Sequence, residues 1–304
     1  MPAVPDAWVI VGSGRCGLQL ARTMAAAGLA VSGVACRGAR GHARLRRWLP
    51  GVAAVAPAAE LPAVTALLIA VPDDALASCA ADLARRRPST LRIALHTSGL
   101  HSATVLAPLQ ERGVATGSFH PLVTFPAPGG PLVPVAGALA AVEGDAAAVR
   151  AGLRLARALG MAGRRLDASE KTRYHAAAAI AANLTHVLVV EARSLMEAAG
   201  FGRREAARAL LPLIDAAMTA ALGARGLERL TGPIARGDAG TVRAHLSVLD
   251  PHLAAAYRAV AVLGLARLQA SGACEAVAKS ALDSVLRSLT ATDRCGSLPA
   301  DERT

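Results

Sequence analysis

The 304-residue sequence is poor in aromatic side chains, with two Trp, two Tyr and three Phe, or 2% of the chain. A core with so few aromatics must be built from Ala, Leu and Val, and helices that meet through such small residues pack closely. Hydrophobic residues nevertheless make up 53% of the chain, which is long enough for two domains. We therefore expect a globular protein with a sizeable core.

Cysteine and lysine are also scarce. The five cysteines lack the paired spacing of a zinc site or a disulfide framework, so we predict no metal centre; they are Cys16, Cys36, Cys79, Cys274 and Cys295. Lys171 and Lys279 are the only lysines among 33 basic residues. Because arginine stays protonated in proteins, a retained lysine is where proton chemistry is to be sought.

Membrane and nucleic-acid signals are absent as well. The longest apolar run, residues 176–190, is interrupted by Asn183 and His186 and is short for a bilayer crossing. The first residues, MPAVPDAW, lack the basic region of a signal peptide. The net charge of +11 is spread along the chain, without interleaved aromatics for base stacking. We expect a cytoplasmic protein that binds neither membrane nor nucleic acid.

A glycine motif near the N-terminus is the most informative feature. The run 8–11 (WVIV) is typical of a buried strand and leads into Gly12-x-Gly14-x-x-Gly17, after which residues 18–27 favour a helix. In a dinucleotide site the first glycine permits a tight turn, the second lets backbone amides approach the pyrophosphate, and the third allows close helix packing. The alternative, a glycine-rich turn without a ligand, explains the flanking strand and helix less well.

The end of the next strand bears on which dinucleotide binds. An NAD site usually has Asp or Glu about 20 residues beyond the glycines, whereas arginine suits the 2′-phosphate of NADP. Here residues 34–40 read VACRGAR, with Arg37 and Arg40 and no carboxylate. This favours NADP(H), unless both arginines are ordinary solvated residues.

Strands and helices alternate through the first half. Strands are predicted at 29–34, 67–71, 91–95, 114–118, 137–142 and 164–166, and helices at 73–86, 102–112 and 145–159, with an irregular Pro/Gly-rich excursion at 121–134. This rhythm predicts a doubly wound, mostly parallel α/β sheet, a Rossmann domain over residues 1–166. An all-helical substrate and dimerisation domain over 167–290 and a disordered tail over 291–304 would follow.

Ligands gather at the carboxyl ends of the strands in such sheets, so residues just after each strand are candidates. Ser13, Arg15 and Cys16 within the glycine motif, Val71 and Pro72 after one strand, and Thr97 and Ser98 after another complete the predicted cofactor site. His96 and His120, at two strand ends, are predicted to bind substrate or help transfer a proton. A structural role for each histidine is the alternative.

A long helix from residue 169 to about 199 carries the predicted catalytic group. At about 100° per residue, Lys171, His175, His186 and Asn183 fall within about 120° of one another and form a polar stripe among alanines. Lys171, His175 and Asn183 are the predicted catalytic residues; a solvent-exposed face is the competing interpretation. Further on, Arg236 in LTGPIARGD is predicted to pair with a substrate carboxylate, and Asp238 to cap a helix.

The segments HTSG (96–99), SFHPLVTF (118–125), KTRYHAAAAIAAN (171–183) and LTGPIARGD (230–238) resemble those of a group that joins a Rossmann-like domain to a C-terminal domain of unknown function. That group is similar to the 6-phosphogluconate dehydrogenase-like superfamily, which includes ketopantoate and pyrroline-5-carboxylate reductases. The resemblance implies a catalytic lysine, matched by Lys171, and a homodimer formed through the helical domain. Where those enzymes have Asn one turn after the lysine, this chain has His175.

Together these features predict an NADPH-dependent oxidoreductase that reduces a small 2-oxo acid such as ketopantoate, with Lys171 as the general acid. Two alternatives stay open. One is reduction of a cyclic imine, which needs less of a lysine acid because an imine can arrive protonated. The other is a non-catalytic protein that binds or senses NADP(H).

Overall fold

The computed structural model describes residues 7–55, 61, 63–126, 130–270, 280 and 282–286. The chain divides into two compact units, residues 1–185 and 186–304. The predicted boundary lay at residue 166. The difference arises because the helix after residue 167 places Lys171 and Tyr174 against strand residues of the first unit, through hydrogen bonds to Ser118 and His120.

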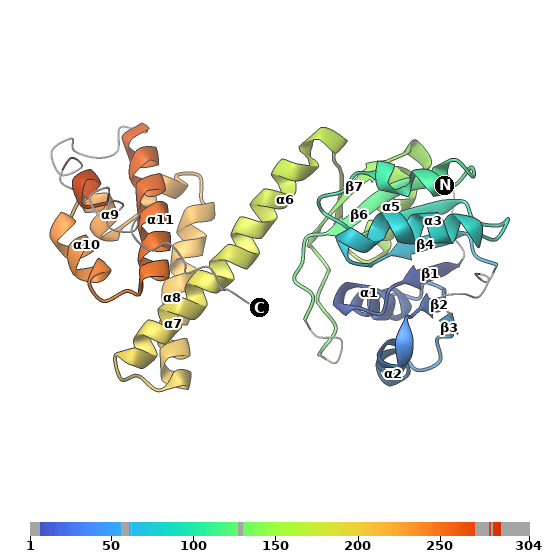
Figure 1. Ribbon diagram of the computed structural model, residues 1–304, viewed down its shortest axis with the longest axis horizontal. Helices are drawn as coiled ribbons and strands as arrows, with labels where there is room; N and C mark the ends of the chain where they lie inside the picture. Colours follow the sequence, from blue (N-terminus) through green and yellow to red (C-terminus); the bar gives the residue numbers. More distant parts are fainter. Residues whose placement is uncertain are drawn as a thin grey trace, which may run out of the picture. The chain divides into compact units, whose positions relative to one another are not determined.

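The first unit is built on an eight-stranded sheet (Figure 1). Its order is β3-β2-β1-β4-β5-β6-β7-β8, with β1 Trp8–Val11, β2 Val31–Ala35, β3 Ala54–Val55, β4 Ala66–Ile69, β5 Ile93–His96, β6 Ala115–Pro121, β7 Leu139–Gly144 and β8 Ala162–Arg165. Neighbouring strands pair in parallel except β6 and β7, which are antiparallel. The predicted Rossmann-like, mostly parallel sheet is confirmed.

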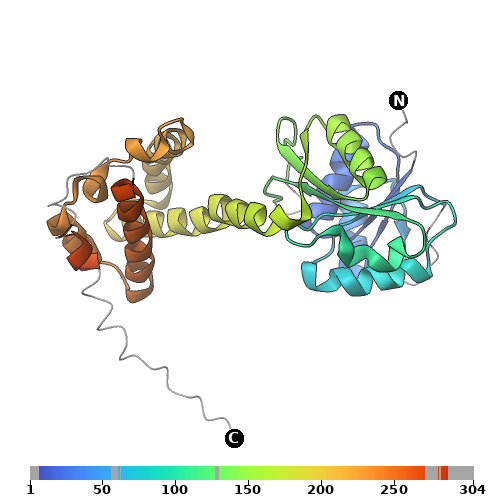
Figure 2. The same cartoon turned by 90° about the horizontal axis from the view of Figure 1, so that it is seen from above.

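Helices cover both faces of this sheet (Figure 2). Residues of α1 (Arg15–Ala26), α2 (Gly38–Trp48) and α5 (Ala146–Ala158) join one buried cluster, and residues of α3 (Leu76–Arg85) and α4 (Ala107–Gln110) join the other. Strands buried on both faces must be apolar throughout, which β1 and β4 are. This accounts for their reading as continuous hydrophobic runs.

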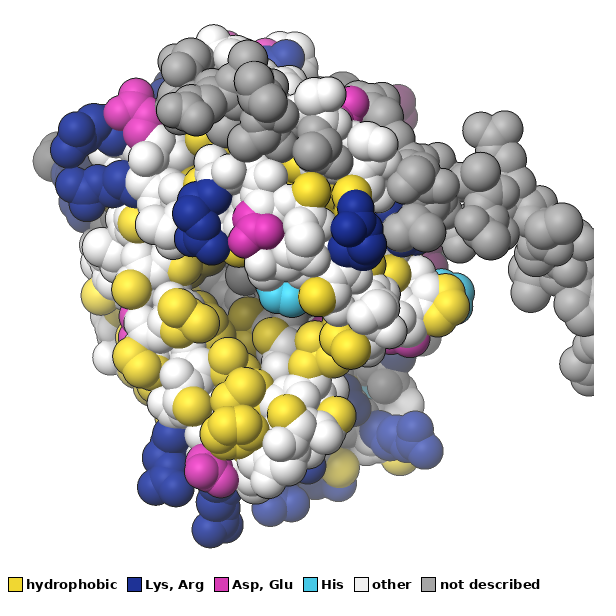
Figure 3. Space-filling model, turned by 90° about the vertical axis from the view of Figure 1, so that its left-hand side faces the viewer, with side chains coloured by type: hydrophobic (Ala, Val, Ile, Leu, Met, Phe, Trp, Pro, Cys, Tyr) yellow, Lys and Arg dark blue, Asp and Glu magenta, His cyan; other side chains and the backbone are white. Residues whose placement is uncertain are grey.

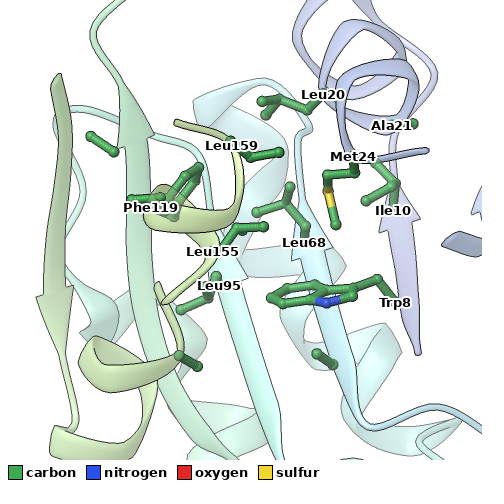
Figure 4. Close-up of a cluster of buried hydrophobic side chains, with 14 of the residues drawn as sticks. Trp8, Ile10, Leu20, Ala21, Met24, Leu68, Leu95, Phe119, Leu155 and Leu159 are labelled. Atoms are coloured by element: carbon green, nitrogen blue, oxygen red, sulfur yellow. The ribbon is translucent and has the colours of Figure 1, made fainter. Parts of the chain in front are cut away.

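The core of the first face differs in one respect from the expectation of a core built from Ala, Leu and Val. Leu68, Leu95 and Leu155 do pack there, but Trp8 and Phe119 lie among them as the two largest fully buried side chains (Figure 4). These two aromatic side chains therefore bury the largest individual surfaces of this core.

The long helix predicted for residues 169–199 is present but not uniform. A short 3₁₀ turn, Ala168–Glu170, leads into α6 (Lys171–Ala179), a π-helical turn follows at Ile180–Leu184, and α7 runs over Thr185–Ala198. A π turn contains an extra residue, so side chains on its two sides no longer follow one 3.6-residue period. The predicted stripe from Lys171 to Asn183 and His186 assumed an unbroken period.

The second unit is helical, as predicted, with α8 (Arg203–Leu222), α9 (Gly232–Arg236), α10 (Ala239–Leu246) and α11 (Pro251–Ala270). Its buried cluster is formed by α10, α11 and residues 282–286. By contrast, α7 has no buried residue and α8 has only Ala206. Residues 280 and 282–286 are also helical, and the predicted tail over 291–304 lies outside the described residues.

Candidate cofactor and active site

The glycine motif forms a tight loop between β1 and α1. Gly12 has φ of +115°, and a Cβ there would lie 2.3 Å from the carbonyl oxygen of Ala70, which follows β4. A Cβ on Gly17 would lie 2.1 Å from the carbonyl oxygen of Gly12. Beside Gly14, in contrast, the space is open. Two glycines are thus required for packing, and the third borders space that a ligand can enter.

The start of α1 fits an anionic ligand. The helix begins at Arg15, directly after Gly14, with no side-chain cap and no acidic residue in its first turn. Its first N–H groups and its dipole therefore favour a negative group such as a pyrophosphate. Thr97 is brought to the same loop by a hydrogen bond with the Cys16 side chain, and burial raises the pKa of that thiol to about 11.

A cavity of about 330 Å³ extends from this loop toward the end of β2. Most of the predicted cofactor residues line this cavity, namely Gly12, Ser13, Gly14, Arg37, Val71 and Pro72. Its opposite wall is formed by α3 and the residue that follows this helix, and it includes Asp82 and Arg86. Neither residue was predicted from the sequence. Both arise from a helix one strand away, so that only the folded sheet brings them to the cavity.

Lys171 is buried at the carboxyl ends of β5 and β6. Its Nζ donates to Ser118 Oγ at 2.8 Å and to the carbonyl oxygen of Ser98 at 3.3 Å. The carboxylate of Glu143 accepts in turn from Ser118 Oγ at 3.4 Å and from the backbone N–H of Ala103 at 2.9 Å. The lysine therefore starts a polar chain that runs from β5 through β6 to β7.

Burial is the main influence on the Lys171 pKa, which it lowers, while Glu143 and Asp73 oppose the shift. The physical cause is the loss of solvent around the ammonium group. A lowered pKa is the direction that proton transfer near neutral pH requires.

Three aromatic side chains lie together near Lys171. His120 Nδ1 and Tyr174 Oη are 2.8 Å apart, and the rings of Tyr174 and His175 both meet the His120 ring edge to face. A Cβ on Gly99 would approach His175 Nδ1 to 2.5 Å and His120 Nε2 to 2.9 Å. Glycine at residue 99 therefore makes room for the pair of imidazoles.

This cluster contains two predicted residues and one that was missed. His120 and His175 come together as candidates for proton transfer, and Tyr174 joins them because it follows Lys171 by three positions on α6. Burial lowers the pKa of His120 to about 4, with the charges of His175 and Lys171 acting in the same direction. A neutral His120 can then accept the hydrogen bond of the Tyr174 hydroxyl.

His96 occupies a different position from that expected of a substrate contact. It is fully buried, its Nδ1 accepts from the backbone N–H of Ser98 at 3.2 Å, and its Nε2 lies 3.2 Å from the carbonyl oxygen of Ser102. Because Nδ1 accepts, Nε2 carries the proton and donates. Both ring nitrogens are thus used to hold the loop after β5.

Two further predicted residues are exposed. Asn183 lies in the π turn and is exposed, as are the other residues of that turn. Arg236 belongs to the second unit, where it is exposed and its charge acts on the carboxylate of Asp238. Asp238 accepts from the backbone N–H of Thr241 at 3.0 Å, so its predicted role as a helix cap is confirmed.

Comparisons with known proteins agree with this architecture. Residues 6–121 match the Rossmann-like domain family, and residues 138–263 match the family described as domain of unknown function (DUF2520). The chain is therefore a two-domain protein, with a Rossmann-like N-terminal domain and a DUF2520 helical C-terminal domain. None of the curated proteins matches it.

Solved structures with this fold include several oxidoreductases. A Bacteroides fragilis protein described as an NADP oxidoreductase is 20% identical and has a TM-score of 0.74. The match covers 86% of this chain and 98% of the Bacteroides fragilis chain. The Aspergillus terreus reductive aminase, solved with NADPH4, cyclohexanone and allyl amine, is 17% identical over 91% of this chain and 98% of its own, with a TM-score of 0.63. A Coxiella burnetii pyrroline-5-carboxylate reductase is 11% identical, with 95% of this chain and 98% of that chain covered and a TM-score of 0.53. The likeness shows a shared fold, that of NADP-dependent oxidoreductases.

Proposed function

We propose that the protein is an NADPH-dependent oxidoreductase that reduces the carbonyl group of a small 2-oxo acid, with a ketopantoate-like acid as the leading substrate. The observation that carries this proposal is the combination of the open glycine loop at α1 with a buried lysine at the neighbouring strand ends. The loop suits a pyrophosphate and the lysine suits the oxygen of a carbonyl. Proteins of the same fold that are described as an NADP oxidoreductase or were solved with NADPH4 support this choice of cofactor.

Each of the buried polar residues has a separate role in the proposed reaction. Bound NADPH would supply the hydride. Lys171 Nζ has three N–H donors, of which Ser118 Oγ and the Ser98 carbonyl accept two, and the third is directed to the substrate oxygen. The lysine gives its proton to that oxygen as the carbon is reduced. The His120–Tyr174 pair orients the substrate and returns a proton from solvent to the site.

Reduction of a cyclic imine is the second candidate function. The burial of Lys171 favours it, because an imine that arrives protonated needs no proton from a lysine with so little solvent contact. The fold shared with a reductive aminase and a pyrroline-5-carboxylate reductase points the same way. The two candidates differ in their dependence on Lys171.

The decisive experiment monitors NADPH oxidation against 2-oxo acids, 3-oxo acids and cyclic imines, with Lys171→Met and, as the matched control, Lys279→Met, the only other lysine. We expect a 2-oxo acid to be reduced and Lys171→Met to lower kcat by about 100-fold or more, with NADPH affinity unchanged. Turnover of imines alone, insensitive to Lys171→Met, would establish the second candidate. Tight NADPH binding without turnover of any compound would overturn both and favour a cofactor-binding protein.

We also propose that two copies associate through the helical unit. Side chains of α7, α10 and α11 line a cavity of about 900 Å³, and hydrophobic side chains gather around a hollow on this face (Figure 3). The helix 168–198 is apolar, with a mean hydropathy of 1.3 in its most apolar window, yet none of that window is buried. A chain that carries both an apolar groove and an apolar helix can pair with a second copy by twofold symmetry.

The oligomeric state tests this association. We expect sedimentation equilibrium to give a dimer that Leu188→Glu, on the groove, dissociates; Leu132→Glu is a matched control, since the two leucines are 40% and 41% exposed. By length and composition alone, the described helices 168–198 and 251–270 would also suffice to cross a membrane. If the protein is instead a monomer that floats with lipid vesicles, the dimer proposal is overturned and the apolar face binds a membrane surface.

A further inference from the structure

The end of the cofactor cavity beside Arg37 is lined by charged side chains from two separate segments. Arg37 comes from the segment after β2, Asp82 lies in the last turns of α3, and Arg86 directly follows that helix. Cys79 of α3 also lines the cavity, and the charges of Arg37, Asp82 and Arg86 all act on the pKa of its thiol. Two arginines from separate elements therefore face the same part of the cavity.

Arg86 differs from its neighbour Arg85 in how it is held. The carboxylate of Asp82 pairs with both, at 3.1 Å for Arg85 and through a close contact for Arg86. The Arg85 side chain is 68% exposed, whereas that of Arg86 is only 19% exposed and lines the cavity. Burial of the guanidinium costs solvation unless an anion compensates it, and Asp82 provides that compensation.

We propose that Arg86 is a second specificity-determining residue for the cofactor, which together with Arg37 binds the 2′-phosphate of NADP(H), while Asp82 holds the Arg86 guanidinium toward the cavity. This inference rests on the proposed function, because it concerns the same cofactor site. A guanidinium has five N–H donors, more than a bidentate carboxylate takes, so Arg86 can serve Asp82 and a phosphate together.

The charges at this end of the cavity match a phosphate better than a hydroxyl group. A phosphate monoester carries about −1.5 to −2 at neutral pH, and Arg37 and Arg86 supply two positive charges against the single negative charge of Asp82. A 2′-hydroxyl would leave this positive charge uncompensated. The competing arrangement has Asp82 accept the ribose 2′-hydroxyl of NAD(H), but Asp82 already accepts from Arg85 and Arg86.

Equilibrium binding distinguishes these arrangements without any knowledge of the substrate. Isothermal titration of the full chain would measure the Kd of NADPH and NADH, and of adenosine 2′,5′-bisphosphate and adenosine 5′-monophosphate, which differ only in the 2′-phosphate. Arg86→Met and Arg86→Gln would each weaken binding of NADPH and the bisphosphate by about tenfold or more, with little change for the other two ligands. Arg85→Met is the matched control and leaves all four affinities unchanged.

Three results would overturn the inference, each in a recognisable way. An unchanged ratio of NADPH to NADH affinity in both Arg86 variants would remove Arg86 from the phosphate site. A selective loss of NADH affinity in Asp82→Asn would show that Asp82 is the ribose ligand of an NAD site. Wild-type protein that binds neither dinucleotide would refute the proposed function itself, whereas the first two results leave dinucleotide binding intact.

Discussion

The buried imidazole of His96 makes the stability of the first unit depend on pH. Burial, together with the charge of Lys171, lowers the His96 pKa to about 3, from about 6.5 for an exposed histidine. The folded protein therefore keeps His96 neutral as the pH falls below 6.5, whereas the unfolded chain takes up a proton. Stability from this group is fully present above about pH 6.5 and is lost as the pH falls toward 3.

The size of this effect follows from the two pKa values. At pH 5, about 1.5 units below the unfolded value, the difference in proton binding amounts to about 2 kcal/mol of lost stability. Such a loss is a large part of the 5–15 kcal/mol by which a protein is typically stable. It is larger than the net contribution of either hydrogen bond that His96 makes.

Urea unfolding at pH 7.5 and pH 5, followed by tryptophan emission, measures the effect. Trp8 and Trp48 are the only tryptophans, and both lie in the first unit, so the signal reports the unit that contains His96. We compare the wild type with His96→Gln, whose amide can replace both hydrogen bonds but does not titrate, and with His42→Gln, which changes an exposed imidazole. If the wild type and His96→Gln lose equal stability between the two pH values, the reasoning is refuted.

Further outcomes follow from the contacts of individual residues. Gly12→Ala forces a Cβ against the carbonyl oxygen of Ala70, so we expect dinucleotide affinity, measured by titration, to fall at least about tenfold, in contrast to Gly28→Ala, whose φ is also positive but which meets no neighbour. Asp238→Ala removes a helix cap and should lower the urea midpoint of the helical signal; an unchanged midpoint would contradict it. Tyr174→Phe leaves the His120 imidazole without its hydroxyl partner and should cost about 1 kcal/mol, whereas retained stability would show that solvent replaces that bond.

The parts of the site that depend on neighbouring residues were predictable from the sequence. The glycine loop is determined by a strand, a turn and a helix within 20 or so residues, and Gly12 and Gly17 leave no room for a Cβ. The alternation of strands and helices likewise predicted the sheet, with the antiparallel β6–β7 pair as the exception within the mostly parallel order. Lys171 stood out because the chain uses arginine almost everywhere else.

Other parts required the fold. Asp82 and Arg86 read as an ordinary i, i+4 pair on a helix surface, and only the order of the strands places them opposite Arg37. His96 read as a polar residue at a strand end, and its burial within the turn depends on backbone geometry. A signal for Tyr174 did exist, since Lys171, Tyr174 and His175 share one face of α6 at spacings of three and four.

The π turn at 180–184 holds one residue more than the same length of α-helix. The surplus residue is absorbed within the turn, so deletion of Ala181 or Ala182 would restore regular α-helical hydrogen bonding there. The spacing between Lys171 and the side chains of α7 would then follow a single 3.6-residue period. One surplus residue in a run of alanines thus explains why a helical period counted along the sequence fails at this turn.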